Sequence, residues 1–586
     1  MNIIGISGFA NAVSFKRTHW PGLDEREYRI SQGHDAAAAL VSGGVTVAAA
    51  AEERFDRRKH SAAFPIRAIS YCLKEAGISI RDVDEIAHAF DYRPYRKIFS
   101  VDPLTSRLYE EVFSREALLD AVHRELPGFP DDRVHHVSHH EAHAASAWLT
   151  SGWDECLVIV MDGMGEAHGC SVYEAAGGRL KPIRHFSAKD SIGIFYSVLT
   201  LYLGFDFNSD EYKIMGLAPY GDPSRFCAFF ESAVRLEENG GISIPALRLN
   251  VTREERENYG ATRKYLSECL GPARKPDEPL RQAHRDIAAA LQQCLNRAVV
   301  HIAENFGRQT GLRRLAMAGG VALNCVANAQ LAESGVFDDI YVQPAAGDDG
   351  SALGAALARS AFHGQICNRR SPAPFFGPAS AAGEVEQALG NFDGRIETTR
   401  FASTRQACAA AAQLIAGGRV IAWHRGRMEF GPRALGNRSI LADPGHPEMR
   451  DRINAMVKKR EAFRPFAPAV SIEQAQHWFD LPPGADFRYM IQTAGVRPEH
   501  RSALPAITHV DGSARVQTVS ADDNPDFHML LKEVGAATGR EMVLNTSFNV
   551  KGQPIVNTPH EAIETFLGTG IEFLFLENTL VGRKNR

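Results

Sequence analysis

The stretch between residues 138 and 163 decides the fold. It reads Ser138-His139-His140-Glu141-Ala142-His143-Ala-Ala-Ser-Ala-Trp148 and, after Gly152, Cys156-Leu-Val-Ile-Val-Met-Asp162-Gly163. His139 and His143 are four residues apart, so on a helix both imidazoles project from one face and could share a metal ion. The apolar run predicts a buried strand. An acid at its carboxyl end, Asp162, would point into the crevice where open α/β sheets bind ligands.

A second acid occupies the same kind of position. Residues 340–344 predict a strand, and Asp348 follows at the turn before an Ala-rich helix. Two histidines at this spacing can also be solvated or core residues, but the two acids favour a metal site. His140 is the rival of His139 as a ligand, and the i,i+4 geometry favours His139.

Composition bounds the class of protein. With 586 residues, the chain is too long for one core, which predicts several domains. The formal charge of −5 gives no reason to expect nucleic acid or an anionic membrane surface as a partner. Nine scattered cysteines without a CxxC pair favour reduced thiols, and no apolar run has transmembrane length. We expect a cytoplasmic globular protein, with a homodimer left open.

Two parts of the first 180 residues share one pattern. Residues 3–51 and 157–178 each suggest a strand, a Gly-containing turn, a second strand and a Gly-Gly turn. Duplicated cores of this kind are typical of the two-lobed actin-like ATPase fold. Phe9–Gln32 has no clear period and is interpreted as an inserted loop, and residues 222–280 as irregular and peripheral.

Glycine turns and arginines suggest anion binding in both halves. Gly319-Gly320 joins a strand to a helix, where free backbone N–H groups favour phosphate. Pro and polar residues near 368–374 predict a domain linker. Beyond it, residues 425–439 carry four arginines among three glycines, which favours a polyanionic small molecule such as ATP.

Seven motifs occur in a family-specific order: His139-His-Glu-Ala-His143-Ala, Asp162-Gly, Glu211-x-Lys-x-Met-Gly-Leu-Ala, Gly319-Gly-Val-Ala-Leu-Asn324, Gly431-Pro-Arg433-Ala-Leu-Gly436, Arg464-Pro-Phe-Ala-Pro468 and Asn545-Thr-Ser-Phe-Asn549. On these motifs the chain resembles the NodU/CmcH-type O-carbamoyltransferases, a group that includes tobramycin carbamoyltransferase. The resemblance covers nearly the whole length. It implies an α/β protein with an actin-like (ASKHA, TsaD-like) two-lobed domain over 1–366, a linker over 367–374 and a YrdC-like α/β domain over 375–586.

The resemblance also implies the chemistry. The C-terminal domain would form carbamoyl adenylate from carbamoyl phosphate and Mg-bound ATP. The N-terminal domain would pass the carbamoyl group to a hydroxyl of a small-molecule acceptor, with secondary metabolites as the expected class. A tRNA threonylcarbamoyl-type transferase is the strongest rival. An actin-like ATPase or sugar kinase is a second rival, and a non-catalytic binding protein is a third.

Residue roles follow from the same resemblance. His139, His143, Asp162 and Asp348 would hold a divalent metal, Fe(II) first, with Mn or Zn as alternatives. Adenylate would be held by Gly319, Gly320 and Asn324. ATP and carbamoyl phosphate would be bound by Arg433, Lys458, Arg464, Arg515, Ser547 and Asn549. Three of these residues are expected to be catalytic: Arg433, Lys458 and Arg464.

A His-Asp pair is expected beside the acceptor and the adenylate. His34 and Asp35 match this motif, and either could be the base that activates the acceptor hydroxyl. The segment Phe9–Gln32 departs from the family, which usually reaches this pair within a few residues of the first strand. We expect the extra residues to form part of an acceptor pocket or a lid, with a surface loop as the alternative.

Overall fold

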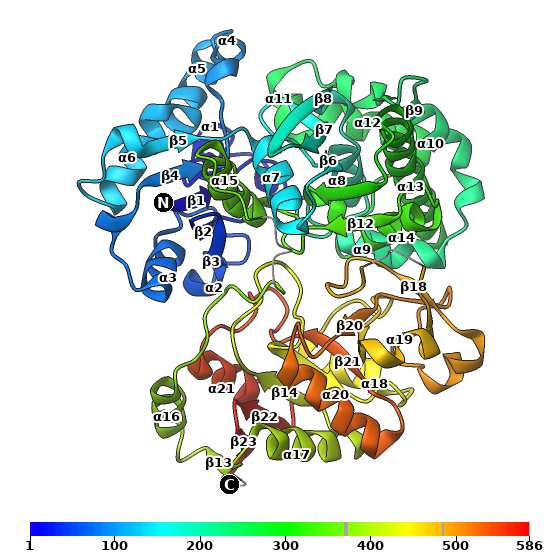
Figure 1. Cartoon of the computed structure of the whole chain (residues 1–586). Helices are drawn as coiled ribbons and strands as arrows, with labels where there is room; N and C mark the ends of the chain where they lie inside the picture. Colours follow the sequence, from blue (N-terminus) through cyan, green and yellow to red (C-terminus); the bar gives the residue numbers. More distant parts are fainter. Residues whose placement is uncertain (368–372, 483–485, 585–586) are drawn as a thin grey trace. The chain divides into compact units, whose positions relative to one another are not determined.

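The computed structural model describes residues 1–367, 373–482 and 486–584, which belong to two compact units (Figure 1). Unit 1 comprises Met1–Glu52 and His60–Ser371, and unit 2 comprises Glu53–Lys59 and Pro372–Arg586. The expected linker falls mostly outside the described residues. No local pattern predicted that Glu53–Lys59 packs with unit 2. Arg54 donates to the Gly431 carbonyl at 3.0 Å there, and Arg57 pairs with Glu561 at 3.1 Å.

Unit 1 contains two five-stranded sheets of the same design. The first has the order β3-β2-β1-β4-β5, and the second has the order β8-β7-β6-β11-β12. In each sheet the first three strands of the chain pair antiparallel, and the last two pair parallel. The strands are β1 Asn2–Ser7, β2 Ala37–Ser42, β3 Val45–Ala51, β4 Glu85–His88, β5 Val134–His136, β6 Cys156–Met161, β7 His168–Ala176, β8 Arg179–Ser187, β11 Arg314–Ala318 and β12 Asp339–Val342.

This shared order confirms the duplication predicted from the sequence. The duplicated halves begin with β1 and β6, which both lie at the centre of their sheets. Both strands are buried and apolar, as a central strand covered on both faces requires. The protein is a mixed α/β protein, and its duplicated topology agrees with the expected two-lobed actin-like design.

Two helices of unit 1 carry the predicted site residues. Helix α7 spans His139–Ser151 and ends at Gly152, and α15 spans Asp348–Phe362. Helix α15 packs against both α7 and β1. The backbones of these elements lie in direct contact. A Cβ on Gly354 would lie 1.7 Å from the carbonyl oxygen of Ala142, and a Cβ on Gly5 would lie 1.8 Å from the carbonyl oxygen of Ala352. Glycine at these positions therefore allows α15 to lie directly against α7 and β1.

We expect Gly354→Ala to destabilise unit 1. The added methyl overlaps a carbonyl of α7, and such overpacking costs typically about 1–3 kcal/mol. Gly383→Ala is the matched control, because Gly383 lies in helix α16 (Ala382–Asn391) with open space around it. Alanine there should be neutral or should stabilise by up to about 1 kcal/mol. Urea unfolding measures both changes, and equal stabilities for the two variants would contradict the packing described.

Two segments expected to be irregular contain helices instead. Phe9–Gln32 includes helix α1 (Ala12–His19) and a short 3-10 helix over Glu27–Arg29. Residues 222–280 include α10 (Cys227–Ala233), α11 (Arg253–Asn258) and α12 (Gly260–Leu270). These helices are short, so their apolar period is weak.

The segment Phe9–Gln32 is held by both halves of unit 1. Its aromatic residues join a cluster with Phe90, Tyr92 and Phe113 on the side of the first sheet. On the other side, buried Lys16 donates to the carbonyl of Glu257 at 2.7 Å, and Arg263 pairs with Glu27. The segment is thus a packed element that links α11 and α12 to the first sheet.

Unit 2 is built on one eight-stranded sheet with helices on both faces. The strand order is β13-β23-β22-β14-β15-β21-β16-β20. Helices α17 (Thr404–Ala416) and α20 (Pro525–Thr538) pack together and share one apolar core with the sheet. Helices α16 and α21 (Pro559–Leu567) contribute to a second core. The strands are β13 Ile396–Arg400, β14 Ile421–His424, β15 Arg438–Ala442, β16 Ala467–Ser471, β20 Gln517–Val519, β21 Met542–Ser547, β22 Phe573–Leu576 and β23 Thr579–Arg583.

One helix of unit 2 has a changed hydrogen-bonding pattern at its carboxyl end. Helix α18 covers Met449–Ile453, and Asn454–Lys458 continues it as a π-helical turn. Such turns often occur at functional sites, and this one ends at Lys458, a predicted site residue. Within the part of the chain that the structure describes, no helix is both long enough and apolar enough to cross a membrane.

Candidate active site and metal centre

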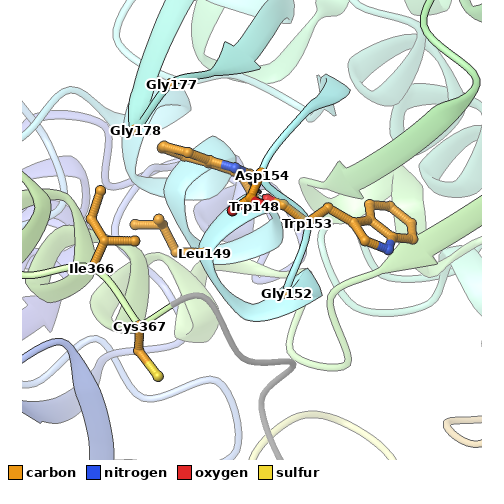
Figure 2. Close-up of a pocket in the computed structure, with 9 residues that line it drawn as sticks. All are labelled: Trp148, Leu149, Gly152, Trp153, Asp154, Gly177, Gly178, Ile366 and Cys367. Atoms are coloured by element: carbon orange, nitrogen blue, oxygen red, sulfur yellow. Dashed lines mark hydrogen bonds between the residues drawn. The ribbon is translucent and has the colours of Figure 1, made fainter.

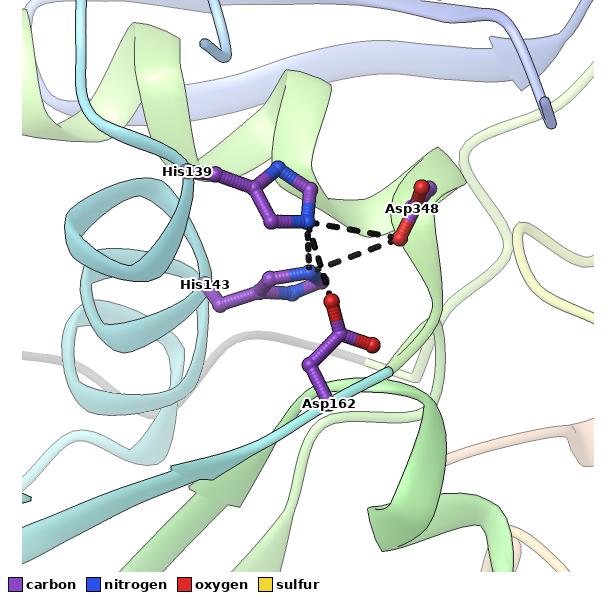
Figure 3. Close-up of side chains that lie close together, drawn as sticks. All are labelled: His139, His143, Asp162 and Asp348. Atoms are coloured by element: carbon purple, nitrogen blue, oxygen red, sulfur yellow. Dashed lines mark hydrogen bonds and ion pairs between the residues drawn. The ribbon is translucent and has the colours of Figure 1, made fainter. Parts of the chain in front are cut away.

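Four side chains predicted to act together converge in unit 1 (Figure 3). His139 and His143 come from the first turns of α7, Asp162 directly follows β6, and Asp348 is the first residue of α15. The Nε2 atoms of the two histidines are 3.0 Å apart. His139 Nε2 lies 3.3 Å from Asp162 Oδ2 and 3.5 Å from Asp348 Oδ1, and His143 Nε2 lies 3.7 Å from the same Asp348 oxygen.

This donor set fits a divalent metal ion. The four ligand atoms all lie within 4.8 Å of one another. A tetrahedral ion with metal–ligand bonds of about 2.0–2.1 Å places its ligands about 3.3–3.4 Å apart, close to the separations seen here. Both histidines are fully buried, and two imidazoles with two carboxylates suit Fe(II), Mn(II) or Zn(II). The cluster can therefore hold a metal, and its residues do not select one.

Neighbouring groups fix the orientation of His139. Its Nδ1–H donates to the Ala89 carbonyl at 3.1 Å, which leaves Nε2 for the cluster. Its ring stacks on Phe90 with centroids 3.9 Å apart. Glu166 Oε1 accepts from the backbone N–H of His139 at 2.8 Å and from that of Asp91 at 2.7 Å, and so holds the start of α7. Sequence reasoning missed Glu166, because its partners lie in two distant segments.

The expected adenylate-binding residues lie beside Asp162. Gly320 donates its N–H to Asp162 Oδ1 at 3.0 Å. Gly319 adopts a φ of 92°, and a Cβ there would lie 2.3 Å from the Met161 carbonyl oxygen, so only glycine fits. Asn324 begins helix α14 (Cys325–Glu333), where its side chain accepts from the N–H of Ala327. The structure thus brings this turn directly against the His/Asp cluster.

Charge interactions shift the pKa values of the cluster strongly. Burial alone would lower the pKa of His139, but the carboxylates of Asp348 and Asp162 outweigh it and hold that pKa well above its usual value. Burial acts to raise the pKa of Asp162, yet the hydrogen bond and charge of His139 hold it far below the usual range. In the absence of metal, a protonated His139 therefore lies between two carboxylates.

We expect metal uptake to release a proton, because an imidazolium must lose its proton before it binds a metal. The same pKa predicts that His139 stabilises the metal-free protein below about pH 6.5, and that this contribution is lost as the pH rises through the raised pKa.

Metal affinity should rise about tenfold per pH unit below the raised pKa of His139. Calorimetric titration of the metal in two buffers of different ionisation enthalpy measures the protons released. Equal heats in both buffers would contradict a protonated His139.

His140, the rival ligand, points away from the cluster. Its Nδ1 lies 2.7 Å from Ser171 Oγ, and the same hydroxyl lies 2.8 Å from His185 Nδ1. The structure thus groups His139 rather than His140 with His143.

The His-Asp pair lies in the loop between β1 and β2. His34 Nε2 is hydrogen bonded to Ser31 Oγ at 3.0 Å, and burial lowers the pKa of this imidazole. The Asp35 carboxylate accepts from His60 Nδ1 at 2.8 Å. Gln32 donates to the carbonyls of Met164 at 2.7 Å and Gly165 at 2.5 Å. The loop therefore touches the segment that follows Asp162.

In unit 2, three of the predicted residues form one group. Lys458 Nζ donates to the Ser547 carbonyl at 2.5 Å and to Asn549 Oδ1 at 2.7 Å. Burial lowers the pKa of Lys458 well below its usual value, and the charges of Arg460, Arg464 and Lys59 add to this effect. A buried amine surrounded by cations favours an incoming anion. Lys59 and Arg460 were not among the residues expected here.

The remaining predicted residues of unit 2 lie on loops. Arg464 is 21% exposed and lies 3.6 Å from Glu461, which is three residues earlier. Arg433 lies in the turn before β15, and Arg515 lies between β19 (Ser513–Ala514) and β20; both are half-buried. The charge of Arg464 reaches Lys458.

A cavity of about 310 Å³ opens at the other end of α7 (Figure 2). Its lining includes Trp148, Trp153 and Ile366, and none of the predicted site residues. His139 and Trp148 are nine residues apart on α7, which corresponds to about 14 Å along a helix. This cavity is therefore separate from the His/Asp cluster.

Two family models match two parts of the chain. Residues 28–357 match the family model "Carbamoyltransferase N-terminus", and residues 412–583 match "Carbamoyltransferase C-terminus". Nodulation protein NolNO of Sinorhizobium fredii is 41% identical over 94% of this chain and 79% of that protein. An uncharacterized Synechocystis protein is 39% identical over 94% of this chain and 95% of that protein. The 3'-hydroxymethylcephem-O-carbamoyltransferase of Streptomyces clavuligerus is 39% identical over 42% of this chain and 44% of that protein.

Solved structures resemble the N-terminal part only distantly. Component A of (R)-2-hydroxyglutaryl-CoA dehydratase from Acidaminococcus fermentans matches 62% of this chain and 99% of that chain, at 14% identity and a TM-score of 0.33. HypF from T. kodakarensis matches 63% of this chain and 49% of that chain, at 15% identity and a TM-score of 0.31. Scores this low add nothing to the topology described above.

The duplicated sheets and the buried His/Asp cluster define a two-lobed α/β protein with a metal-type site where α7 and α15 begin. The chain belongs to the carbamoyltransferase family, and it is an enzyme that transfers a carbamoyl group.

Proposed function

We propose that the chain is an ATP-dependent O-carbamoyltransferase with two half-reactions. Unit 2, expected to be YrdC-like, would use one water molecule to split carbamoyl phosphate into carbamate and phosphate, and the carbamate would attack Mg-bound ATP to give carbamoyl adenylate and pyrophosphate. Unit 1, expected to be TsaD-like, would pass the carbamoyl group to a hydroxyl of a small molecule and release AMP. The observation that carries this proposal is the convergence of His139, His143, Asp162 and Asp348 in a carbamoyltransferase.

The residue chemistry of unit 2 suits the first half-reaction. Both substrates are polyanions, and positioning with charge neutralisation supplies most of the catalysis in such reactions. Lys458, with the charges of Arg460, Arg464 and Lys59 around it, offers this neutralisation. Ser547 and Asn549 accept hydrogen bonds from Lys458 Nζ, which would exchange these partners for an arriving phosphate oxygen. Arg433 and Arg515 are proposed as further phosphate ligands.

The second half-reaction needs a polarised carbamoyl group and a deprotonated alcohol. A metal held by His139, His143, Asp162 and Asp348, with Fe(II) as our first choice, would act as a Lewis acid. Gly320 supports this site because its N–H holds the second oxygen of Asp162. Gly319, Gly320 and Asn324 form a turn whose backbone can approach the adenylate closely.

The acceptor is proposed to be a hydroxylated small molecule. One relative is named for carbamoylation of a 3'-hydroxymethylcephem, and two others are nodulation proteins. A screen should therefore begin with alcohols of secondary metabolism. The segment Phe9–Gln32 is proposed as one wall of the acceptor site, because it packs across both halves of unit 1 and leads into His34.

Pyrophosphate release from ATP, with and without carbamoyl phosphate, tests the proposal. Release that requires carbamoyl phosphate is the expected result, followed by AMP and a carbamate ester when a suitable alcohol is present. ADP as the only nucleotide product would favour a kinase. Release that requires threonine and bicarbonate in place of carbamoyl phosphate would favour a threonylcarbamoyl-type transferase. Binding of ATP with no turnover by metal-loaded protein would favour a non-catalytic binding protein.

A further inference from the structure

Three side chains from distant parts of unit 1 form a hydrogen-bonded line. Asp35 Oδ1 accepts from His60 Nδ1 at 2.8 Å, and His60 Nε2 lies 3.2 Å from the hydroxyl oxygen of Ser209. With its proton on Nδ1, His60 presents an unprotonated Nε2 to that hydroxyl. This is the arrangement by which a carboxylate orients an imidazole as a base for an alcohol. The His60 side chain is 19% exposed, so a small molecule can reach it.

The backbone at this line is held in an uncommon conformation. Asp35, His60 and Asn208, which precedes Ser209, have positive φ values of 57°, 58° and 51°. Each such residue costs of order 1 kcal/mol or more, and these residues gather where strain serves a functional geometry. These three positions are members of the line or lie directly beside one.

The line also lies next to the loop that carries Asp162. Asp35 belongs to the loop after β1, and its carbonyl accepts from Ser7 at the end of that strand. Gln32 of the same loop donates to Met164 and Gly165, two and three residues after Asp162. The loops that follow the two central strands are therefore in contact.

We propose that His60 is the general base that takes the proton from the acceptor hydroxyl, and that Asp35 is the positioning residue that orients it. The Ser209 hydroxyl marks where the acceptor oxygen would lie. The acceptor oxygen bonds to the carbamoyl carbon, and the bond from that carbon to the phosphate oxygen breaks. The hydroxyl proton moves to His60 Nε2, and AMP leaves with the bonding electron pair. This inference rests on the proposed function.

His34 suits the role of general base less well than His60. Its Nε2 is hydrogen bonded to Ser31, three residues earlier in the same loop. His60, in contrast, has a carboxylate on Nδ1 and a hydroxyl from a distant segment on Nε2. Sequence reasoning named Asp35 and missed His60, because the two are separated by 25 positions and Ser209 lies 149 positions beyond His60.

The His60→Gln variant tests the proposal when it is assayed with two kinds of nucleophile, those that need a base and one that does not. Water and methanol must lose a proton to attack, whereas hydroxylamine attacks as a neutral amine at pH 7. In the variant, carbamoyl transfer to water or methanol should fall about 10²–10⁴-fold. Formation of hydroxyurea from hydroxylamine and pyrophosphate release should both persist. The pH–rate profile for methanol should also lose its histidine-like ascending limb.

His123→Gln is the matched control, because His123 is exposed and also hydrogen bonds an aspartate, Asp131. It should behave as wild type with every nucleophile. Asp35→Asn should lower transfer to methanol and shift the ascending limb, and it should spare transfer to hydroxylamine.

Several outcomes would overturn the role of His60. The first is a His60→Gln variant that transfers the carbamoyl group to methanol at the wild-type rate. The second is a folded His60→Gln variant that no longer releases pyrophosphate. The third is loss of transfer in Ser209→Ala together with a carbamoylated Ser209 in the wild-type enzyme. The last would make Ser209 a covalent nucleophile. No carbamoyl phosphate-dependent pyrophosphate release by the wild-type enzyme would instead refute the proposed function itself.

Discussion

Replacing His143 by alanine should abolish carbamoyl transfer to the acceptor while leaving carbamoyl phosphate-dependent pyrophosphate release intact. His143 is fully buried, and its Nε2 lies 3.0 Å from that of His139 and 3.7 Å from Asp348. Loss of one of the four proposed ligands should lower metal affinity and so remove the Lewis acid proposed for unit 1. Transfer should fall by at least about 10³-fold, an effect in the range that loss of electrostatic stabilisation produces.

The control for this variant is the neighbouring histidine. His140 is buried on the same helix, but it hydrogen bonds Ser171 and lies outside the cluster. His140→Asn should retain the metal content of the wild type, whereas His143→Ala should lose it. Elemental analysis and the two half-reaction assays measure these properties in parallel. Loss of pyrophosphate release in a folded His143→Ala protein would refute the division into two half-reactions.

Replacing Arg464 by alanine should have the opposite effect and abolish pyrophosphate release. Arg464 is partly exposed, and its charge acts on the buried Lys458, so an anion bound between them would be neutralised by both. Loss of the guanidinium should lower the rate of adenylate formation by at least about 10²-fold. Arg464→Lys should recover only part of it, because an ammonium lacks the planar fork that binds phosphate through two hydrogen bonds.

Arg497→Ala serves as the control for Arg464. Arg497 also belongs to unit 2, and its guanidinium donates to the Gln476 carbonyl and pairs with Asp480 at the surface. Pyrophosphate release should be unchanged in this variant. Thermal unfolding should show that Arg464→Ala remains folded, and a folded Arg464→Ala enzyme with normal release would remove Arg464 from the donor site.

Features set by short-range periodicity could be predicted well from the sequence. The spacing of His139 and His143 placed both on one face of α7, and the Gly-rich turns located the duplicated strands. Asp348 could be added because strand-to-helix turns of open α/β sheets gather at one edge.

Features that depend on pairs of distant segments could not be predicted in this way. The proposed base, His60, is recognised only through its hydrogen bonds with Asp35 and Ser209. Glu166 is recognised only through the hydrogen bonds that it accepts from Asp91 and His139. The helix in Phe9–Gln32 was missed because it is short and many of the contacts that hold this segment come from α11 and α12. Lys59 was missed because nothing in its local sequence assigns residues 53–59 to unit 2.

Residues 53–59 belong to unit 2 although the segments on either side belong to unit 1, and this limits how the chain can be cut into separately expressed domains. The chain passes between the units three times, after residues 52, 59 and 371, so one cut near residue 371 leaves a piece of unit 2 attached to unit 1. A fragment that starts at Pro372 would lack Arg54 and Arg57, which bond to Gly431, Ile555 and Glu561. The two proposed half-reactions are therefore better separated by point substitution than by expression of isolated domains.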